Sequence, residues 1–354
     1  MMLKQILHTG MARKASDILI IAGLPVSYKI NGVIMRDGQR LLPADTAALA
    51  EELYRMAGDR DMTRLLEEGD DDFSFALPGL CRFRVNALKQ RGSLGLVIRV
   101  VSFQLPDRKA LGIPDGVMSF AAYNRGLVLY TGPAGSGKTT TLACIVDEIN
   151  STRNAHVITI EDPIEYLHQH RQSVVTQREL NTDTRSYDAA LRAALREAPD
   201  IILVGEMRDT KTIRAAVTAA ETGHLVISTL HTIGASNTID RILDSFPPQQ
   251  QDQIRMQLAM VLEGVVSQRL LPTLDGRQVP AFEIMKVNSA VRSMIRESRC
   301  HQLDNTIAQS AGEGMITLDQ SILNLVQSGQ VAPADAVRFA TNPDWMRKRL
   351  GVSG

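Results

Sequence analysis

The order of apolar and polar positions predicts two folded regions, with a boundary near residue 101. In the first region, a stretch with helical spacing, 44–56, lies among short strand-like runs. These runs cover residues 17–22, 26–30, 32–35, 72–77, 82–88 and 94–101. Asn31 and Gly32 form a dipeptide that favours a two-residue hairpin turn, because both positions tolerate positive φ. We therefore expect a small α/β domain over residues 1–101.

The second region repeats a strand–helix order from residue 117 to about residue 280. Its nearly all-apolar runs suit strands that are buried on both faces of a parallel sheet, and helical patterns separate them. The runs are 127–131, 157–160, 201–204 and 225–229, and the helical stretches are 139–150, 187–197 and 210–221. This alternation predicts a doubly wound α/β domain.

Breaks in the pattern set the remaining boundaries. Two prolines and two glycines between residues 102 and 116 interrupt regular structure, so we expect a linker there. Residues 281–354 are predicted to be mainly helical. Helical spacing recurs there at 290–296, 302–309 and 318–328.

The eight residues from Gly132 to Thr139 match the phosphate-binding pattern G-x-x-x-x-G-K-[ST], between a predicted strand and a predicted helix. Glycines let the backbone wrap around phosphate oxygens, and consecutive N–H groups at a helix N-terminus form an anion cradle. Lys138 is expected at the β- and γ-phosphates, and the Thr139 hydroxyl is expected to ligate Mg²⁺. The predicted ATP-binding residues are Gly132, Pro133, Ala134, Gly135, Ser136, Gly137, Lys138, Thr139 and Thr140. A glycine-rich turn that matches by chance would not explain the flanking strand and helix.

Glu206 follows the apolar run 201–204. Ligands of open α/β sheets lie at the carboxyl ends of the strands, so Glu206 is expected to face the phosphate loop. A carboxylate there can orient and polarise the attacking water. We predict that Glu206 is the catalytic base.

Three more carboxylates, Glu161, Asp162 and Glu165, follow the run 157–160. They are predicted to hold Mg²⁺, in part through waters, or to help position the nucleophile. Glu161 and Asp162 are the candidates for the metal, and Glu165 is the candidate for the catalytic role. The alternative is a solvated polar turn at Pro163.

Two histidines flank the apolar run 225–230. His231 lies at its carboxyl end and is the candidate for sensing the γ-phosphate. His224 lies at its amino end, where a structural role or a role across an interface is expected. For either histidine, the alternative is a hydrogen-bonded structural residue at a strand end.

Composition narrows the function classes. Lys and Arg together number 39, as do Asp and Glu, so charge provides no argument for a nucleic-acid partner and we expect none. The three cysteines are far apart in sequence, which excludes a disulfide framework or a sequence-local zinc site. No apolar run reaches the roughly 18 residues that span a bilayer, so membrane association is expected through a partner.

Four motifs follow one another between residues 132 and 232. They cover residues 132–141, 158–166, 195–209 and 220–232. In that order they resemble the Walker A motif, the Asp box, the Walker B region and the His box of type II/IV secretion ATPases. Segments 246–248, 294–297 and 314–320 resemble C-terminal features of the PilT family in particular.

The resemblance implies more about the fold and the site than the spacing does. It implies a PAS-like domain over 1–101, a RecA-like P-loop ATPase core over 117–280 with a helical C-terminal region, and a homohexameric ring. It also implies that arginines of the first domain reach the nucleotide phosphates, where a guanidinium stays charged and donates in a planar fork. The matching positions are Arg84 and Arg99, and also Arg82 and Arg125.

The implied function is an ATP-hydrolysing motor that drives type IV pilus retraction and twitching motility. Such a motor is cytoplasmic and associates with the inner membrane through a pilus platform protein, with paralogous pilus ATPases as further partners. The tail after residue 305 departs from the pattern, so an accessory retraction ATPase of the PilU kind is an alternative. Assembly and type II secretion ATPases are a second alternative. They typically carry a longer N-terminal region and a four-cysteine zinc insertion, and this chain is expected to have neither.

Two further classes use the same core. A nucleic-acid motor is disfavoured by the balanced charge, and DNA-stimulated turnover with a steep salt dependence would indicate it. A nucleotide-gated scaffold without turnover is disfavoured by Glu206, since binding alone does not need a base at that position.

Overall fold

The computed structural model describes residues 2–30, 32–77, 81–101, 105 and 107–352. The chain forms two compact units. Unit 1 comprises residues 1–104 together with 164–167, and unit 2 comprises residues 105–163 together with 168–354. The prediction of a linker over 102–116 falls partly on residues 102–104 and 106, which lie outside the described residues.

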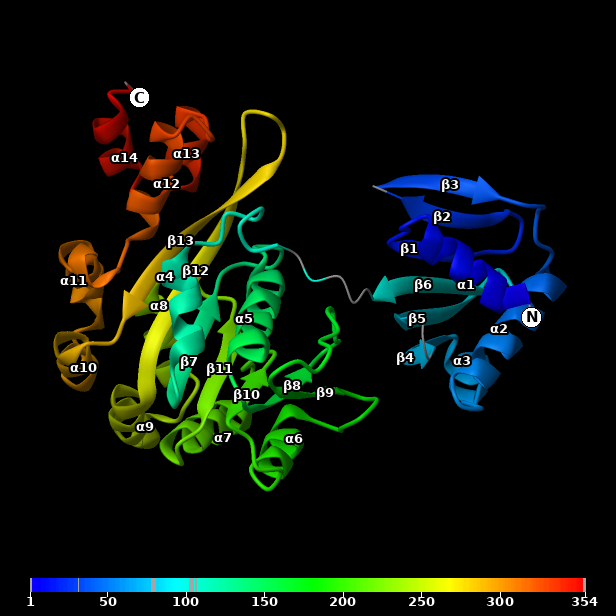
Figure 1. Cartoon of the computed structure of the whole chain (residues 1–354), viewed down its shortest axis with the longest axis horizontal. Helices are drawn as coiled ribbons and strands as arrows, with labels where there is room; N and C mark the ends of the chain where they lie inside the picture. Colours follow the sequence, from blue (N-terminus) through cyan, green and yellow to red (C-terminus); the bar gives the residue numbers. More distant parts are fainter. Residues whose placement is uncertain (1, 31, 78–80, 102–104, 106, 353–354) are drawn as a thin grey trace. The chain divides into compact units, whose positions relative to one another are not determined.

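Unit 1 contains a six-stranded antiparallel sheet in the order β3-β2-β1-β6-β5-β4 (Figure 1). Its strands are β1 (Asp17–Ile20), β2 (Val26–Ile30), β3 (Val33–Asp37), β4 (Asp70–Leu77), β5 (Cys81–Gln90) and β6 (Ser93–Val101). Its helices are α1 (Met2–Ala12), α2 (Pro43–Met56) and α3 (Thr63–Glu68). Ile30 pairs with Val33, so β2 and β3 join across two residues as the hairpin prediction requires, although Asn31 lies outside the described residues.

Alternate residues of the strands enter the core of unit 1. In β5, Phe83 and Val85 are buried, whereas Arg84 between them lies on the other face of the sheet. The buried face packs in one cluster with apolar residues of the helices, including Leu7 of α1 and Leu53 of α2. This period-two burial confirms the strand predicted over 82–88.

Unit 2 contains a seven-stranded sheet in the order β13-β12-β7-β11-β10-β8-β9 (Figure 1). The strands are β7 (Gly126–Thr131), β8 (His156–Glu161), β9 (Val174–Glu179), β10 (Ile201–Val204), β11 (Leu225–Leu230), β12 (Leu262–Pro272) and β13 (Gln278–Lys286). The strands from β12 to β9 in this row pair in parallel, and β13 pairs antiparallel with β12. The four strands predicted in this region are confirmed.

Helices cover both faces of the sheet of unit 2 because each central strand is apolar on both sides. Leu127 and Leu129 of β7 belong to one core, and Val128 and Tyr130 of the same strand belong to the other. The helices are α4 (Asp115–Met118), α5 (Lys138–Thr152), α6 (Tyr187–Ala194), α7 (Thr210–Glu221), α8 (Ala235–Asp244), α9 (Pro248–Val261), α10 (Ser289–Arg296), α11 (Leu303–Gln309), α12 (Leu318–Gln327), α13 (Pro333–Phe339) and α14 (Pro343–Leu350). Helices α4 and α5 contribute to one core and α6 to α9 to the other.

The structure differs from the sequence prediction around residue 280. Strand β13 runs through to Lys286, past the expected start of the helical region, because it pairs with nine consecutive positions of β12. From Ser289 onward the region is helical as predicted. Its last helices form a separate apolar cluster with the end of this hairpin, in which Leu271 and Val279 pack against Ile322 of α12. Across the part of the chain that the structure describes, no helix combines the length and apolarity needed to cross a bilayer.

Candidate functional site

The phosphate-binding loop connects β7 to α5, as the sequence predicts. Gly135 and Gly137 have φ values of 76° and 86°. Residues other than glycine adopt such positive values only at a cost in free energy. At Gly132 the constraint is contact: a Cβ there would lie 2.2 Å from the backbone oxygen of Gln268 on β12. The backbone path that cradles an anion therefore depends on glycine at these positions.

Lys138 opens α5 and points back over the loop. Its Nζ donates to the carbonyl oxygens of Gly132 at 2.7 Å and Pro133 at 3.0 Å. Burial lowers the pKa of Lys138, while the negative charge of Glu206 acts in the opposite direction. The phosphate-binding loop thus holds the ammonium group of Lys138 against its own carbonyl oxygens, within the electrostatic influence of Glu206.

Several loop groups are poised for a ligand. Pro133, Ala134 and Gly135 are exposed, and Thr139 and Thr140 are half-buried. The Ser136 hydroxyl is buried within the loop and has no hydrogen-bond partner among the described residues. A buried hydroxyl without a partner is costly, and a phosphate oxygen would satisfy it.

Glu206 lies two residues after β10 and contacts two basic side chains. Its Oε2 accepts a hydrogen bond from Arg208 Nε at 2.7 Å, and its Oε1 lies 3.0 Å from His231 Nε2. The hydrogen bond to Glu206 raises the pKa of Arg208. The structure therefore brings together Glu206 and His231, which the sequence placed at the ends of two separate strands.

Backbone contacts between neighbouring strand ends hold Glu206 in place. The Gly205 N–H donates to the carbonyl of Ile160 at 2.8 Å, and its carbonyl accepts from the Thr229 hydroxyl at 2.6 Å. Met207 N–H donates to the carbonyl of Thr229 at 3.1 Å. Gly205 also leaves little room: a Cβ there would lie 2.9 Å from the Tyr187 hydroxyl.

The acidic segment after β8 lies at the same edge of the sheet. Glu161 Oε1 accepts from the Thr159 hydroxyl at 2.6 Å and from Gln177 Nε2 of β9 at 3.1 Å. Asp162 is exposed, and burial together with the charge of Asp162 raises the pKa of the nearby Tyr187. Glu165 is exposed and belongs to the segment 164–167 of unit 1.

His224 lies at the opposite edge of the sheet. Its Nδ1 is 3.0 Å from the carbonyl oxygen of Ala219 and 3.1 Å from the Thr222 hydroxyl, at the end of α7. Within unit 2 the structure therefore does not bring His224 to the cluster of Glu206 and His231. Both roles expected for His224, a structural one and one across an interface, stay predictions.

Three of the four predicted arginines, Arg82, Arg84 and Arg99, belong to unit 1, whereas Arg125 belongs to unit 2. Arg84 of β5 lies directly opposite Arg99 of β6 in the register of the sheet. Arg99 also forms an ion pair with Asp17 of β1 at 3.0 Å. The two guanidinium groups thus share one face of the sheet, the face opposite the core, and their role at a nucleotide stays a prediction.

Sequence reasoning missed Gln268, which the structure places against the phosphate loop. Gln268 is buried on β12, and its Oε1 accepts from the Thr141 hydroxyl of α5 at 2.8 Å. The same side chain would lie 3.0 Å from a Cβ at Gly137. Thr141 and Gln268 are 127 residues apart, so no local sequence pattern indicates that they meet. The polar pair Ser267–Gln268 within an apolar strand is the one feature of the sequence that marks the position.

Beside the loop, unit 2 has a cavity of about 580 Å³. Gly137 and Thr140 line it on the loop side, and Gln268 lines it on the side of β12. Further wall residues come from the segments 109–113 and 273–280. A cavity of this volume is in the range of small-molecule sites, and it opens directly next to the anion cradle.

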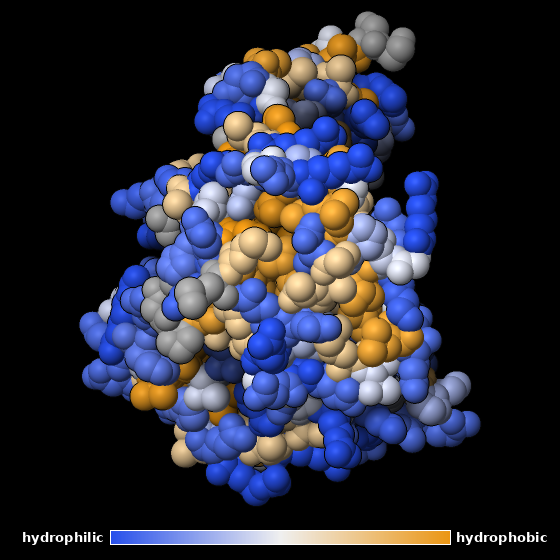
Figure 2. Space-filling view, turned by 90° about the vertical axis from the view of Figure 1, so that its right-hand side faces the viewer, coloured by the Kyte–Doolittle hydropathy of each residue, from blue (hydrophilic) through white to orange (hydrophobic). Residues whose placement is uncertain are grey.

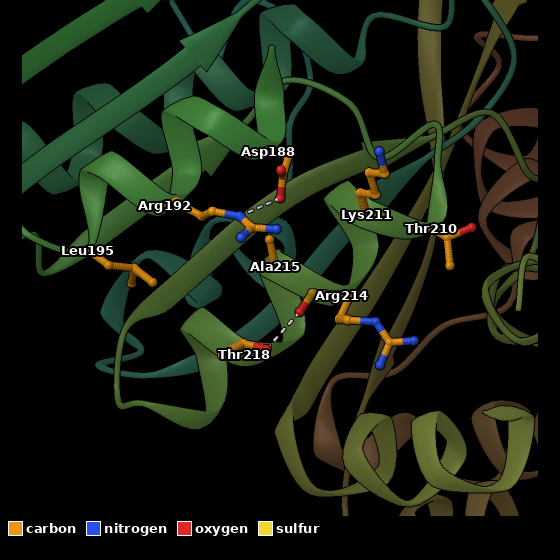
Figure 3. Close-up of a pocket in the computed structure, with 8 residues that line it drawn as sticks. All are labelled: Asp188, Arg192, Leu195, Thr210, Lys211, Arg214, Ala215 and Thr218. Carbon is orange, nitrogen blue, oxygen red and sulfur yellow. Dashed lines mark hydrogen bonds and ion pairs between the residues drawn. The ribbon is translucent and has the colours of Figure 1, made fainter.

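A second cavity, of about 320 Å³, lies between α6 and α7 (Figure 3). Arg192 of α6 pairs there with Asp188 at 3.0 Å. Arg214 of α7 donates to Gln250 at 2.5 Å. Both guanidinium groups already have partners within the protein, and the lining contains none of the residues of the phosphate loop.

Comparison with known proteins gives close relatives. The family described as "Type II/IV secretion system protein" matches residues 1–335. The chain is 42% identical over 330 residues to the type IV pilus retraction ATPase PilT of Pseudomonas aeruginosa. The matched stretch covers 93% of this chain and 95% of the relative. It is 35% identical over 350 residues to the type IV pilus ATPase PilU of the same organism, covering 97% and 90%.

Solved structures agree with this assignment. The pilus retraction motor PilT with bound ADP has a TM-score of 0.87 and 44% identity, covering 97% of this chain and 98% of that one. The Legionella pneumophila ATPase DotB has a TM-score of 0.80 and 28% identity, covering 95% and 94%. A family match over most of the chain, together with these relatives, establishes that the chain belongs to the type II/IV secretion system proteins and, within them, to the PilT family of ATPases.

Proposed function

We propose that the protein is an ATPase motor that drives the retraction of type IV pili. The observation that carries the proposal is the placement of Glu206, held by His231 and Arg208, at the sheet edge that also carries the phosphate loop. That is the constellation needed for hydrolysis rather than for binding alone. The pilus as the object of the work is supported by the relatives, whose names describe pilus retraction and twitching motility.

The phosphates of ATP would lie on the amides of residues 132–139. Lys138, which now donates to two carbonyls of the loop, has oxygens of the β- and γ-phosphates as its alternative acceptors. The buried Ser136 hydroxyl gains a partner in the same step. The fit of phosphate to this loop is supported by Gly132, where a Cβ would clash with the backbone and change the path of the loop.

Magnesium suits the hard oxygen donors at this edge of the sheet. Thr139 is the direct ligand in this proposal, and Glu161 and Asp162 act through waters. Among the described residues no three His, Cys, Asp or Glu side chains converge on one point. An ion held by Thr139 would take further ligands from phosphate oxygens and water, which is the usual coordination of Mg²⁺.

Glu206 is the proposed base for the attacking water. Its Oε2 accepts from Arg208 and its Oε1 lies 3.0 Å from His231 Nε2, so the two contacts fix the orientation of the carboxylate. The His231 side chain is about half exposed, at 52%, and is the proposed sensor of the γ-phosphate. The base and ribose of ATP would occupy the cavity of about 580 Å³ beside Gly137 and Thr140.

The proposed assembly is a homohexamer with a PAS-like first domain and a RecA-like second domain. The RecA-like assignment is supported by the parallel strand order β12-β7-β11-β10-β8 around the loop. In this assembly Arg84, Arg99 and Glu165 complete the nucleotide site, and His224 acts across an interface. The partner is an inner-membrane platform protein, and the protein is placed in the cytoplasm at that membrane.

Exposed apolar surface supports self-association. Figure 2 shows apolar side chains gathered over the middle of one face of the molecule among polar ones. In unit 1, three consecutive residues of the edge strand β3, Val33, Ile34 and Met35, are each more than half exposed. Large exposed apolar surface is unusual for a monomer and typical of protein contacts.

The decisive experiment measures ATP turnover and particle shape with the purified full-length protein. Glu206→Gln is expected to lower kcat by about 100-fold or more, because it removes the base while preserving shape. Lys138→Ala is expected to abolish ATP binding, and Glu67→Gln, on the exposed face of α3, is the matched control. Unchanged turnover in Glu206→Gln would contradict the proposal.

Deletion of the gene tests the direction of the work. Loss of a retraction motor is expected to leave cells with excess pili and no twitching. Cells without pili would place the protein among assembly ATPases. Retraction that is lost only together with a second ATPase would assign the accessory role of PilU, to which the chain is also similar.

A further inference from the structure

A carboxylate outside the nucleotide site is buried between two helix ends. Glu283 lies on β13, and only 6% of its surface is exposed. Among the described residues no Lys or Arg side chain pairs with it. A buried carboxylate without a counter-ion is expensive, so its hydrogen bonds indicate what it does there.

Glu283 accepts a hydrogen bond from the first residue of one helix and lies near the first residue of another. Its Oε1 lies 2.8 Å from the amide nitrogen of Ala235, which opens α8. The amide of Leu318, which opens α12, lies near enough to lower the pKa of Glu283. Helix N-termini favour a negative charge, because their first N–H groups have no partner within the helix.

Helix α8 begins only a few residues after the proposed γ-phosphate sensor. His231 follows β11, and the connection 232–234 leads into α8. The Gly234 N–H donates to the Ser267 hydroxyl at 3.0 Å, and the Gly234 carbonyl accepts from the Thr238 hydroxyl at 2.7 Å. The connection is thus held by β11 at one end and by Ser267 and Glu283 at the other.

We propose that Glu283 is a positioning residue for His231: by holding the amino end of α8, its carboxylate fixes the connection that keeps His231 against Glu206. This inference rests on the proposed function, since it gives Glu283 a part in turnover through His231. Its backbone donor Ala235 belongs neither to the phosphate loop nor to the segment that carries the proposed base, and neither does the nearby Leu318. Glu283 therefore acts on the site through the connection and not by contact with the nucleotide.

The surroundings of Glu283 make the contact sensitive to pH. Burial raises the pKa of Glu283 to about 7, against the opposing effect of the amides of Ala235 and Leu318. Two further carboxylates face it and raise the pKa as well, Asp304 of α11 and Asp319 of α12. As the pH falls through about 7, Glu283 takes up a proton and loses the charge that stabilises the two helix ends.

The first test compares steady-state ATPase kinetics of the wild type and Glu283→Gln between pH 5.5 and 8.5. For the variant we expect about tenfold lower kcat at pH 8, with KM for ATP changed less than about twofold. The substitution leaves the ATP-binding residues unchanged but loosens the position of His231 against Glu206. We also expect the fall of kcat near pH 7 in the wild type to flatten in the variant. Glu313→Gln, an exposed carboxylate of the same unit that accepts from Asn288, is the matched control.

A second variant and a second readout separate positioning from folding. Ser267→Ala removes another contact to the connection but leaves Glu283 charged, so it should lower kcat and keep the fall near pH 7. Hydrogen exchange at residues 232–236 of the wild type should be faster, relative to the intrinsic rates, at pH 6 than at pH 8. Wild-type kinetics in Glu283→Gln, or exchange without this pH dependence, would overturn the inference while the ATPase assignment stands. A wild type that shows the exchange difference but no turnover would instead contradict the proposed function.

Discussion

Gly132 occupies a position that excludes every side chain, since the backbone oxygen of Gln268 lies where a Cβ would be placed. The neighbouring atom belongs to the main chain of a paired strand, so it cannot move aside as a flexible side chain would. The same approach brings β12 against the loop that is proposed to bind phosphate. A single glycine thus links the shape of the anion cradle to the packing of the sheet.

Gly132→Ala is therefore expected to destabilise the protein by about 2 kcal/mol or more and to abolish ATP binding, because the loop must leave its path. Thermal unfolding and binding of a fluorescent ATP analogue measure the two effects. The control is Gly38→Ala, at a positive-φ glycine where an added Cβ would have no atom within 4 Å. Its cost is expected to be only the left-handed strain of about 1 kcal/mol. Normal ATP binding by Gly132→Ala would show that the close approach is not the constraint.

At the scale of elements, α5 and β12 meet through one buried hydrogen bond. The Thr141 hydroxyl donates to Gln268 Oε1 at 2.8 Å, and both residues are almost completely buried. Strand β12 pairs with β7 and with β13, so it connects the loop to the hairpin that packs against the C-terminal helices. The first turn of α5 is thereby tied to the middle of the sheet.

Thr141→Val preserves the shape of the side chain and leaves Gln268 without its donor. We expect a loss of about 1–3 kcal/mol in the free energy of unfolding. We also expect about tenfold weaker ATP binding, since Gln268 lines the cavity next to the loop. Denaturant unfolding and nucleotide titration measure these effects, and Thr218→Val, at an exposed position of α7, is the control. Equal stability of the two variants would mean that the hydrogen bond contributes nothing beyond packing.

At the scale of the whole molecule, the two units have separate apolar cores. Unit 1 also contains a buried ionic group, Asp71, whose oxygens accept from Tyr54 at 2.9 Å and from two nitrogens of Arg60 at 2.8 Å. Burial alone would raise the pKa of Asp71, but the hydrogen bonds from Arg60 and Tyr54 outweigh it and lower the pKa. Changes at Asp71 should therefore affect one unit and not the other.

Asp71→Asn is expected to destabilise unit 1 by about 1–3 kcal/mol at neutral pH while the unfolding of unit 2 is unchanged. Because the folded-state pKa lies below the unfolded value of about 3.9, the contribution of Asp71 is complete at neutral pH and is lost as the pH falls through the folded pKa. The difference between wild type and variant should thus shrink in acid. Urea unfolding followed by hydrogen exchange at several pH values resolves the units, with the exposed Asp72→Asn on the same strand as control. A difference that persists undiminished at low pH would contradict this account.

The sequence by itself determined the features that depend on neighbouring residues. The phosphate loop is encoded by glycines and a lysine within eight positions, and the central strands of unit 2 are encoded by continuous apolar runs. These signals survive without tertiary information because they reflect the local backbone and burial on both faces. The motif order likewise sufficed to indicate the family.

Only the tertiary structure decided which distant residues meet. Strands β9, β12 and β13 are less uniformly apolar, so the local pattern does not predict them, and pairing with neighbouring strands of the sheet stabilises them. The contacts of Gln268 with Thr141, of Glu206 with His231 and of Glu283 with Ala235 depend on strand register and crossover. Residues far apart in sequence share no local backbone geometry, so folding alone places them within hydrogen-bond distance.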